Sequence, residues 1–205
     1  QYLQDLVSWT AIGARTTESP THRKLASGIS SAVGFKNNID GSITVAVNAI
    51  RSASATNSFI SITEEGKVAA FRTDGNPHGH VILRGGKTPN YDAESVAQCE
   101  KELASAGLAA NLMIDCSHGN SSKNPANQSI VLDSVAHQLN TGNNSIIGIM
   151  LESNINEGNQ PIPDDLSEIR HGVSVTDACI NWETTETILR QFASDIAGSL
   201  KSRSA

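Results

Sequence analysis

Five ionisable side chains each follow a short apolar run, and their types indicate anion binding and metal coordination. Three are the cations Arg15, Lys36 and Arg84, and the other two are His118 and Glu152. Guanidinium groups make bidentate contacts with phosphate or carboxylate, and a lysine adds a point charge. In a parallel α/β sheet or barrel, the carboxyl ends of all strands lie on one face. We therefore expect these five side chains to line one site.

A metal ligand set is available in His118, Glu152 and Asp177, which offer one imidazole nitrogen and two carboxylates. These donors suit a borderline divalent ion such as Mn²⁺, Fe²⁺, Co²⁺ or Zn²⁺. No H-x-x-H or H-E-x-x-H spacing supports the histidine, so a hydrogen-bonded structural residue remains an alternative. Cys116 lies two residues before His118, deeper in the same strand, and we expect it to pack in the core.

Backbone groups after Arg84 are a further candidate for anion binding. Because Gly85 and Gly86 lack side chains, we expect their N–H groups to approach an oxyanion closely. For each cation alone, a solvated surface charge or ion pair is the alternative. The sequence lacks G-x-S-x-G, Walker-type and G-x-G-x-x-G motifs, so serine hydrolases, P-loop enzymes and dinucleotide oxidoreductases are not supported.

The elements that must position these groups are short strands alternating with amphipathic helices. We expect a strand before each of the five side chains, and helices over about 20–26, 43–50, 93–106, 129–139 and 183–199. In the fourth helix the residues expected to face inward are Ile130, Val131, Val135 and Leu139. A hairpin over 58–72 interrupts the alternation of strands and helices, and we interpret it as an insertion. The long polar loop 154–172 is of a length that is usually functional.

This pattern predicts an α/β fold of the TIM (β/α)₈ barrel type, in which the chain forms a single domain over 1–205. A closed barrel needs eight strands and about 250 residues. We therefore expect this chain to supply about the last five strands plus the inserted hairpin. Because the sequence begins at Gln1 instead of methionine, we expect it to be a piece of a longer chain.

Composition limits the partners and the compartment. The formal charge of −6 argues against a general nucleic-acid binder, although a local cationic pocket remains possible. Three cysteines without a C-x-x-C pair fit a reducing compartment. No apolar run approaches the roughly 20 residues that cross a bilayer. We expect a cytoplasmic protein that binds neither nucleic acid nor membrane.

Six ordered motifs carry a resemblance to a known family, and together they cover essentially the whole chain. They are AIGARTTES at 11–19, VGFKN at 33–37, ILRGGK at 82–87, MIDCSHGNSSK at 113–123, ESNINEGNQ at 152–160 and SVTDACINWE at 174–183. They closely resemble the type I 3-deoxy-D-arabino-heptulosonate-7-phosphate (DAHP) synthases. Those enzymes condense phosphoenolpyruvate with erythrose 4-phosphate at the entrance to the shikimate pathway, which leads to the aromatic amino acids.

The resemblance implies a role for each matching residue. Phosphoenolpyruvate would contact the Ala14 backbone, Arg15, Lys36 and Arg84, and the catalytic residues would be Lys36 and His118. A divalent metal would be held by His118, Glu152 and Asp177. The family's fourth ligand is a cysteine in a Gly-Pro-Cys motif, and its sugar phosphate contacts come from a Lys-Pro-Arg-Thr motif. Neither motif occurs here, so we expect the isolated chain to be inactive and to bind metal weakly.

Regulation by an aromatic amino acid is a further implication of the resemblance. In feedback-inhibited relatives the inhibitor binds near the hairpin, and Ser30 and Ser61 match serines that line that site. Backbone capping is the alternative for two such serines. Pro20 and Glu64 depart from the family pattern, which leaves the inhibitor open. The full-length form is expected to be a homo-oligomer.

Two other functions remain open at this point. One is a related phosphoenolpyruvate-condensing synthase of the 3-deoxy-octulosonate-8-phosphate or sialic acid type. The other is a non-catalytic amino-acid-binding module derived from the same barrel.

Overall fold

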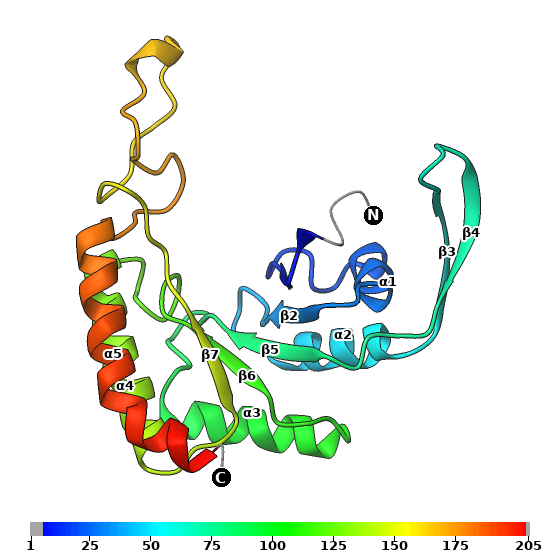
Figure 1. Ribbon diagram of the computed structural model, residues 1–205, viewed down its shortest axis with the longest axis horizontal. Coiled ribbons are helices and arrows are strands. Elements are labelled where there is room, and N and C mark those ends of the chain that lie inside the picture. Colours follow the sequence, from blue (N-terminus) through cyan, green and yellow to red (C-terminus); the bar gives the residue numbers. More distant parts are fainter. Residues whose placement is uncertain (1–5, 204–205) are drawn as a thin grey trace. The chain divides into compact units, whose positions relative to one another are not determined.

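The computed structural model describes residues 6–203, which form parallel strands, one antiparallel hairpin and α-helices (Figure 1). The strands are β1 (Trp9–Ile12), β2 (Ala32–Lys36), β3 (Asn57–Ile62), β4 (Val68–Thr73), β5 (Gly79–Leu83), β6 (Leu112–Asp115) and β7 (Ile146–Met150). The helices are α1 (Pro20–Ser27), α2 (Thr44–Ser54), α3 (Ala93–Ser105), α4 (Gln128–Asn140) and α5 (Trp182–Arg203). All five predicted helices are therefore present, with ends within a few residues of those expected.

The main sheet has five strands in the order β1-β2-β5-β6-β7. With the hairpin left out, this order follows the sequence, so each strand lies beside the next one along the chain. A barrel is built in this way, with a helix between successive parallel strands. The predicted α/β fold with five barrel-type strands is confirmed.

The chain divides into two compact units. The first unit contains the residues up to Leu83 together with Ala97–Met113, and the second unit contains Arg84–Val96 and Ile114–Ala205. The expectation of one domain over 1–205 stays a prediction.

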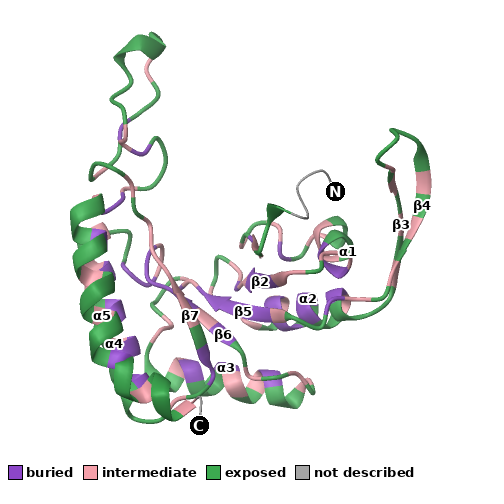
Figure 2. Ribbon diagram, viewed as in Figure 1, coloured by how far each residue is buried: buried purple, intermediate pink, exposed green. Residues whose placement is uncertain are grey.

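The core of the first unit lies on β2, β5 and one face of α2, as the purple segments of Figure 2 show. Phe35, Val81 and Ile82 are fully buried, and Ala49 and Ile50 of α2 are buried too. Apolar residues at helical spacing in α2 produce this one-sided burial. The apolar pattern that predicted the helix is thus the face that packs on the sheet.

Helix α1 begins as its sequence indicates. The Ser19 side chain accepts a hydrogen bond from the His22 backbone N–H, and Pro20 occupies the first turn. Both residues satisfy the preferences of a helix amino terminus. At the other end, the Gly28 N–H donates to the Leu25 carbonyl at 3.0 Å, which ends the helix near the expected position.

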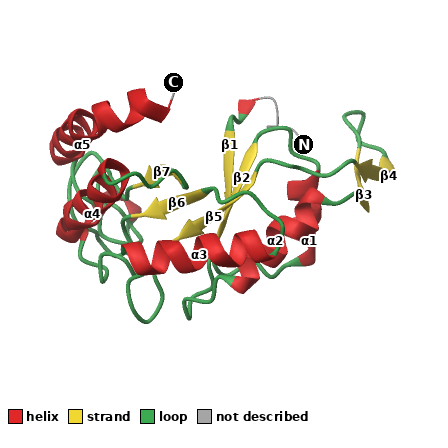
Figure 3. Cartoon of the chain, turned by 90° about the horizontal axis from the view of Figure 1, so that it is seen from below, coloured by secondary structure: helices red, strands yellow, loops and turns green. Residues whose placement is uncertain are grey.

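The hairpin β3–β4 stands apart from β1 and β2 in the first unit (Figure 3). Its strands pair antiparallel, and Phe59 stacks on Phe71 across the ladder with ring centroids 6.2 Å apart. On the opposite face Ile60, Ile62 and Val68 are exposed. The predicted hairpin is present, while its status as an insertion into a barrel stays a prediction.

In the second unit α4 and α5 lie side by side (Figure 1). Val131, Val135 and Leu139 of α4 are buried as expected, but Ile130 is 57% exposed. The prediction that Ile130 faces inward is wrong. Successive residues of a helix are about 100° apart, and the buried Leu132 occupies the inward position on the other side of Val131.

A long connection links β7 to α5 and contains only isolated bridges and the short turn of 3₁₀-helix Leu166–Glu168. The buried Gln160 side chain holds it together, because its Nε2 donates to the carbonyls of Arg170 and Val173 at 2.8 and 3.0 Å. The predicted loop is thus irregular but internally braced.

Among residues 6–203, none of the helices combines the length and the apolar character that crossing a membrane requires.

Candidate metal and anion site

The backbone at the end of β6 adopts an uncommon conformation. His118, Ser122 and Lys123 have φ angles of 51°, 53° and 60°, in the left-handed region. The Lys123 N–H closes this loop by donating to the His118 carbonyl at 2.8 Å. Residues other than glycine adopt such angles rarely, and they cluster at functional sites when they do. The loop therefore holds His118 in a specific, strained geometry.

The His118 ring is oriented by a buried carboxylate. Its Nδ1 lies 3.0 Å from Asp115 Oδ2 and 2.7 Å from Ser117 Oγ. Asp115 is fully buried, and its other oxygen accepts from the Ser117 N–H and hydroxyl at 3.0 and 2.7 Å. A carboxylate beside Nδ1 favours the tautomer that carries its proton there, which leaves the Nε2 lone pair available.

The Nε2 atom faces two carboxylates from distant parts of the chain. Glu152 Oε1 lies 3.4 Å away and Asp177 Oδ2 lies 3.8 Å away. The three candidate ligand atoms are all within 4.8 Å of one another. One imidazole nitrogen and two carboxylate oxygens that converge in this way match the donor set of a borderline divalent ion. The residues present therefore fit a metal, and the structure brings the predicted trio together.

A cavity of about 290 Å³ opens beside this trio. Most of its lining residues carry polar side chains, and the lining comprises Ser117, His118, Ser121, Lys123, Pro125, Gln128, Glu152, Asn159, Asp177 and Ala178. The exposed fraction of the ligand side chains rises from 21% for His118 to 27% for Glu152 and 58% for Asp177. A small molecule in the cavity would reach the trio from the side of Asp177.

Sequence reasoning missed two residues that support the trio. Asp115 closes the apolar run of β6, and a polar residue at that point was a signal that it faces the histidine three positions later. Gln128 is fully buried and bonds the backbone of Glu152, 24 residues away. No local feature of the sequence marks that contact.

The predicted oxyanion role of the glycines after Arg84 is wrong. The Gly85 N–H donates to Asn90 Oδ1 at 2.7 Å and the Gly86 N–H donates to the Thr88 carbonyl at 2.9 Å. A Cβ on Gly85 would lie 2.5 Å from the Gly119 carbonyl carbon, and φ at Gly85 is +75°. These glycines allow two loops to pack closely, because their backbone donors are already used within the loop.

The close packing joins Arg84 to the histidine loop. The Gly119 N–H donates to the Arg84 carbonyl at 3.1 Å. Arg84 directly follows β5, as expected, and is half-buried. Its backbone is therefore fixed to the loop that carries His118.

In the first unit, Thr17 connects the backbones that carry the other two cations. Arg15 is exposed in the turn after β1, beside Ala14, and Lys36 is the half-buried last residue of β2. The Thr17 hydroxyl is buried and shares its hydrogen between the carbonyls of Gly13 and Lys36 at 3.0 and 2.9 Å. The convergence of Arg15 and Lys36 with the residues of the second unit stays a prediction.

The serines expected at an inhibitor site both lie in the first unit. Ser30 is exposed between α1 and β2, and Ser61 is half-buried on β3. Their role in binding an inhibitor stays a prediction.

All three cysteines are free and buried. Burial raises the pKa of the Cys99 thiol to about 12 and raises the pKa values of Cys116 and Cys179 in the same direction. Thiols with raised pKa values carry little reactive thiolate. The prediction that Cys116 packs in the core is confirmed, because it is fully buried.

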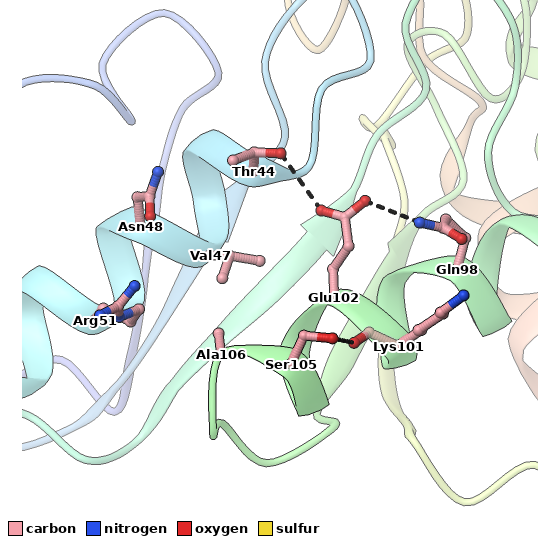
Figure 4. Close-up of a pocket in the computed structure, with 9 residues that line it drawn as sticks. All are labelled: Thr44, Val47, Asn48, Arg51, Gln98, Lys101, Glu102, Ser105 and Ala106. Atoms are coloured by element: carbon pink, nitrogen blue, oxygen red, sulfur yellow. Dashed lines mark hydrogen bonds between the residues drawn. The ribbon is translucent and has the colours of Figure 1, made fainter.

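A second cavity, of about 320 Å³, lies between α2 and α3 in the first unit (Figure 4). Its carboxylate, Glu102, accepts from Thr44 Oγ1 at 3.5 Å and from Gln98 Nε2 at 3.2 Å. Arg51 and Lys101 extend at its two sides, and their charged ends do not converge (Figure 4). The groove therefore belongs to the packing between two helices, and its lining residues form no cluster of side chains suited to catalysis.

The parallel sheet and the histidine–carboxylate trio beyond its strand ends define an α/β barrel-type protein with a candidate metal centre. Comparison with known proteins gives the family. The model of the DAHP synthetase I family matches residues 1–190, and the chain belongs to this family. The resemblance noted from the six motifs is confirmed.

Individual relatives agree with this assignment. The chain is 58% identical over 205 residues to the "Phospho-2-dehydro-3-deoxyheptonate aldolase, Tyr-sensitive" of Salmonella typhimurium, covering 100% of the chain and 58% of the relative. It is 60% identical over 203 residues to the Tyr-sensitive protein of Enterobacter agglomerans, and the match covers 99% of the chain and 95% of that relative. It is 52% identical over 196 residues to the Phe-sensitive protein of Escherichia coli, and the match covers 96% of the chain and 56% of that relative.

A solved structure supports the fold as well. The phospho-2-dehydro-3-deoxyheptonate aldolase of Francisella tularensis superposes with a TM-score of 0.90 at 45% identity. The match covers 96% of this chain and 57% of that one. The chain thus spans rather more than half the length of the Salmonella relative and of this structure.

Proposed function

We propose that this chain is the carboxyl-terminal part of a 3-deoxy-7-phosphoheptulonate synthase, with the hairpin inserted into its barrel. The enzyme would condense phosphoenolpyruvate with erythrose 4-phosphate and water to give DAHP and phosphate. The observation that carries the proposal is the trio of ligand atoms within 4.8 Å in a chain of the DAHP synthetase I family.

His118, Glu152 and Asp177 would hold the divalent ion, which we take to be Mn²⁺, Fe²⁺, Co²⁺ or Zn²⁺. When bound, such an ion supplies Lewis-acid polarisation of the aldehyde oxygen or activation of the water. Asp115 would keep the proton of the His118 ring on Nδ1, so that the Nε2 lone pair remains available to the metal ion.

Arg15, Lys36, Arg84 and the Ala14 backbone would hold the phosphate and carboxylate of phosphoenolpyruvate. C3 of phosphoenolpyruvate forms a bond to the aldehyde carbon, water adds its oxygen to C2, and the C2–O bond breaks to release phosphate. Fixed cations orient a dianionic substrate and stabilise charge that moves onto the departing phosphate. Lys36 and His118 would be the catalytic residues nearest this change.

The names of the relatives include both Tyr-sensitive and Phe-sensitive proteins. We extend that property to this chain as inhibition by an aromatic amino acid near Ser30 and Ser61. We also propose that the full-length protein is a cytoplasmic homo-oligomer, and that the isolated 205 residues are inactive and bind metal weakly.

The test is phosphate release by the full-length protein with phosphoenolpyruvate and a panel of aldoses, with and without a chelator. Release that requires erythrose 4-phosphate and stops with chelator supports the proposal. Release with a different aldose instead would indicate a related synthase, and aromatic amino-acid binding without any release would indicate a non-catalytic module.

A further inference from the structure

The buried amide of Gln128 takes up both backbone polar groups of Glu152. Gln128 is the first residue of α4 and is fully buried. Its Nε2 donates to the Glu152 carbonyl at 3.0 Å, and its Oε1 accepts from the Glu152 N–H at 2.8 Å. A side-chain amide therefore pairs with the backbone of one residue in the way that a neighbouring strand would.

Glu152 needs such a partner because it lies beyond the end of its strand. β7 ends at Met150, whose carbonyl accepts from the Cys116 N–H at 2.8 Å. Two residues later, the Glu152 carbonyl also accepts a hydrogen bond from the Ile180 N–H, at 3.2 Å. Without Gln128 the Glu152 N–H would lose the acceptor that holds it at 2.8 Å.

We infer that Gln128 is a positioning residue for the metal centre, an inference that rests on the function proposed above. The N–H and the carbonyl of Glu152 belong to the two peptide planes on either side of its Cα. Holding both therefore restricts the backbone dihedrals of Glu152 and so the direction of its side chain. That side chain places Oε1 3.4 Å from His118 Nε2. Supporting hydrogen bonds of this kind typically change metal affinity by 10- to 100-fold.

Another buried glutamine of the same helix supplies a matched control. Gln138 is 5% exposed, and its Nε2 donates to the Tyr91 carbonyl at 2.8 Å. Among the residues that line the cavity beside the trio, Gln138 does not occur. Gln138→Met therefore removes a buried amide from α4 without touching the backbone of a candidate ligand.

The experiment measures Mn²⁺ binding by the full-length protein, from the electron paramagnetic resonance signal of the free ion. Gln128→Met is expected to raise the Kd for Mn²⁺ by 10- to 100-fold. Gln138→Met is expected to leave Kd within about twofold of wild type. The Tm of the metal-free protein is recorded for both, so that a loss of stability is separated from a loss of affinity.

Two further variants keep the inference open to refutation. Gln128→Asn retains an amide that is one methylene too short to reach both groups, and it replaces the methionine variant if that protein does not fold. Combined with Glu152→Ala, Gln128→Met should cause no additional loss of affinity. Wild-type affinity in the Gln128 variants, or an equal loss in Gln138→Met, overturns the inference. Absence of Mn²⁺ binding by the wild type overturns the proposed metal centre with it.

Discussion

At the scale of single residues, the proposed metal centre depends on how one imidazole ring is held. His118 is placed by a left-handed backbone angle of 51° and by a contact of its Nδ1 with the buried Asp115. The Nε2 atom, at the opposite edge of the ring, lies near carboxylate oxygens of Glu152 and Asp177. Position and tautomer are thus set by different parts of the same loop.

Replacing the buried carboxylate should weaken metal binding. In Asp115→Asn the amide can turn its NH₂ toward Nδ1, which favours the tautomer with its proton on Nε2 and removes the lone pair from the metal side. We expect Kd for Mn²⁺ to rise about 10- to 100-fold. Asp133→Asn on the exposed side of α4 is the control. Unchanged affinity in Asp115→Asn would show that the ring orientation does not depend on this carboxylate.

His80 gives the first unit a pH-dependent stability. Burial lowers its pKa below the ordinary value, and a backbone hydrogen bond at His78 opposes this in part. Trp9 Nε1 lies 3.1 Å from His80 Nε2 and donates to it, which requires the neutral ring. In the unfolded chain the histidine keeps a pKa of about 6.5, so just below that pH the unfolded state binds more protons.

The free energy of unfolding should therefore fall as the pH is lowered from about 6.5 toward the depressed pKa of His80. Urea unfolding at pH 7 and at pH 5 measures the change. His80→Gln should flatten the dependence, whereas the exposed His78→Gln should leave it as in wild type. An equal slope in the wild type and in His80→Gln would contradict the assignment.

At the scale of elements, apolar periodicity was sufficient to predict the strands and helices. The residues of α2 with helical spacing are the ones that pack on β5, and the five strands end where the ionisable residues begin. Ile130 was misplaced because three apolar residues in a row, Ile130 to Leu132, make the orientation of a helix ambiguous. Gly85 was misread because its partner, Gly119, lies on another loop.

Thr17 fixes the turn after β1 to the end of β2, and it should influence substrate affinity. Thr17→Val removes the hydroxyl between the carbonyls of Gly13 and Lys36. We expect the full-length enzyme to show a KM for phosphoenolpyruvate raised about tenfold, or about 1.4 kcal/mol, with a smaller effect on kcat. The rise in KM should be largely reversed in Thr17→Ser, which restores the hydroxyl.

The neighbouring threonine is the control for this prediction. Thr16 Oγ1 also donates to the Gly13 carbonyl, at 3.1 Å, whereas it is the Thr17 hydroxyl that reaches the Lys36 carbonyl. Thr16→Val should leave KM near the wild-type value. If the two valine variants raise KM equally, the tie to Lys36 has no part in substrate binding.

At the scale of the whole molecule, a bound metal should stabilise the fold. A ligand that binds only the folded protein adds about 2.7 kcal/mol at a concentration 100 times its Kd. We expect the Tm of the full-length protein to rise with Mn²⁺ and to fall back with a chelator. His118→Ala should abolish the shift without lowering the metal-free Tm to a comparable extent. A shift that survives in His118→Ala would place the ion elsewhere.

The composition of the site could be predicted only in part, because its residues come from separate stretches of sequence. His118, Glu152 and Asp177 were found from the ends of apolar runs and from family motifs. Gln128 bonds the backbone of a residue 24 positions away, and such a contact leaves no pattern in the sequence. Residues that carry the chemistry were thus easier to find than those that hold them in place.

The strand order has a practical consequence for any preparation of these 205 residues alone. β1 and β7 stand at the two ends of the order, so in the part of the chain described each offers a rim of backbone donors and acceptors. Exposed edge strands of this kind can pair with strands of other copies of the chain. Low protein concentration and added denaturant, more than purity, are therefore expected to keep such a sample from aggregating.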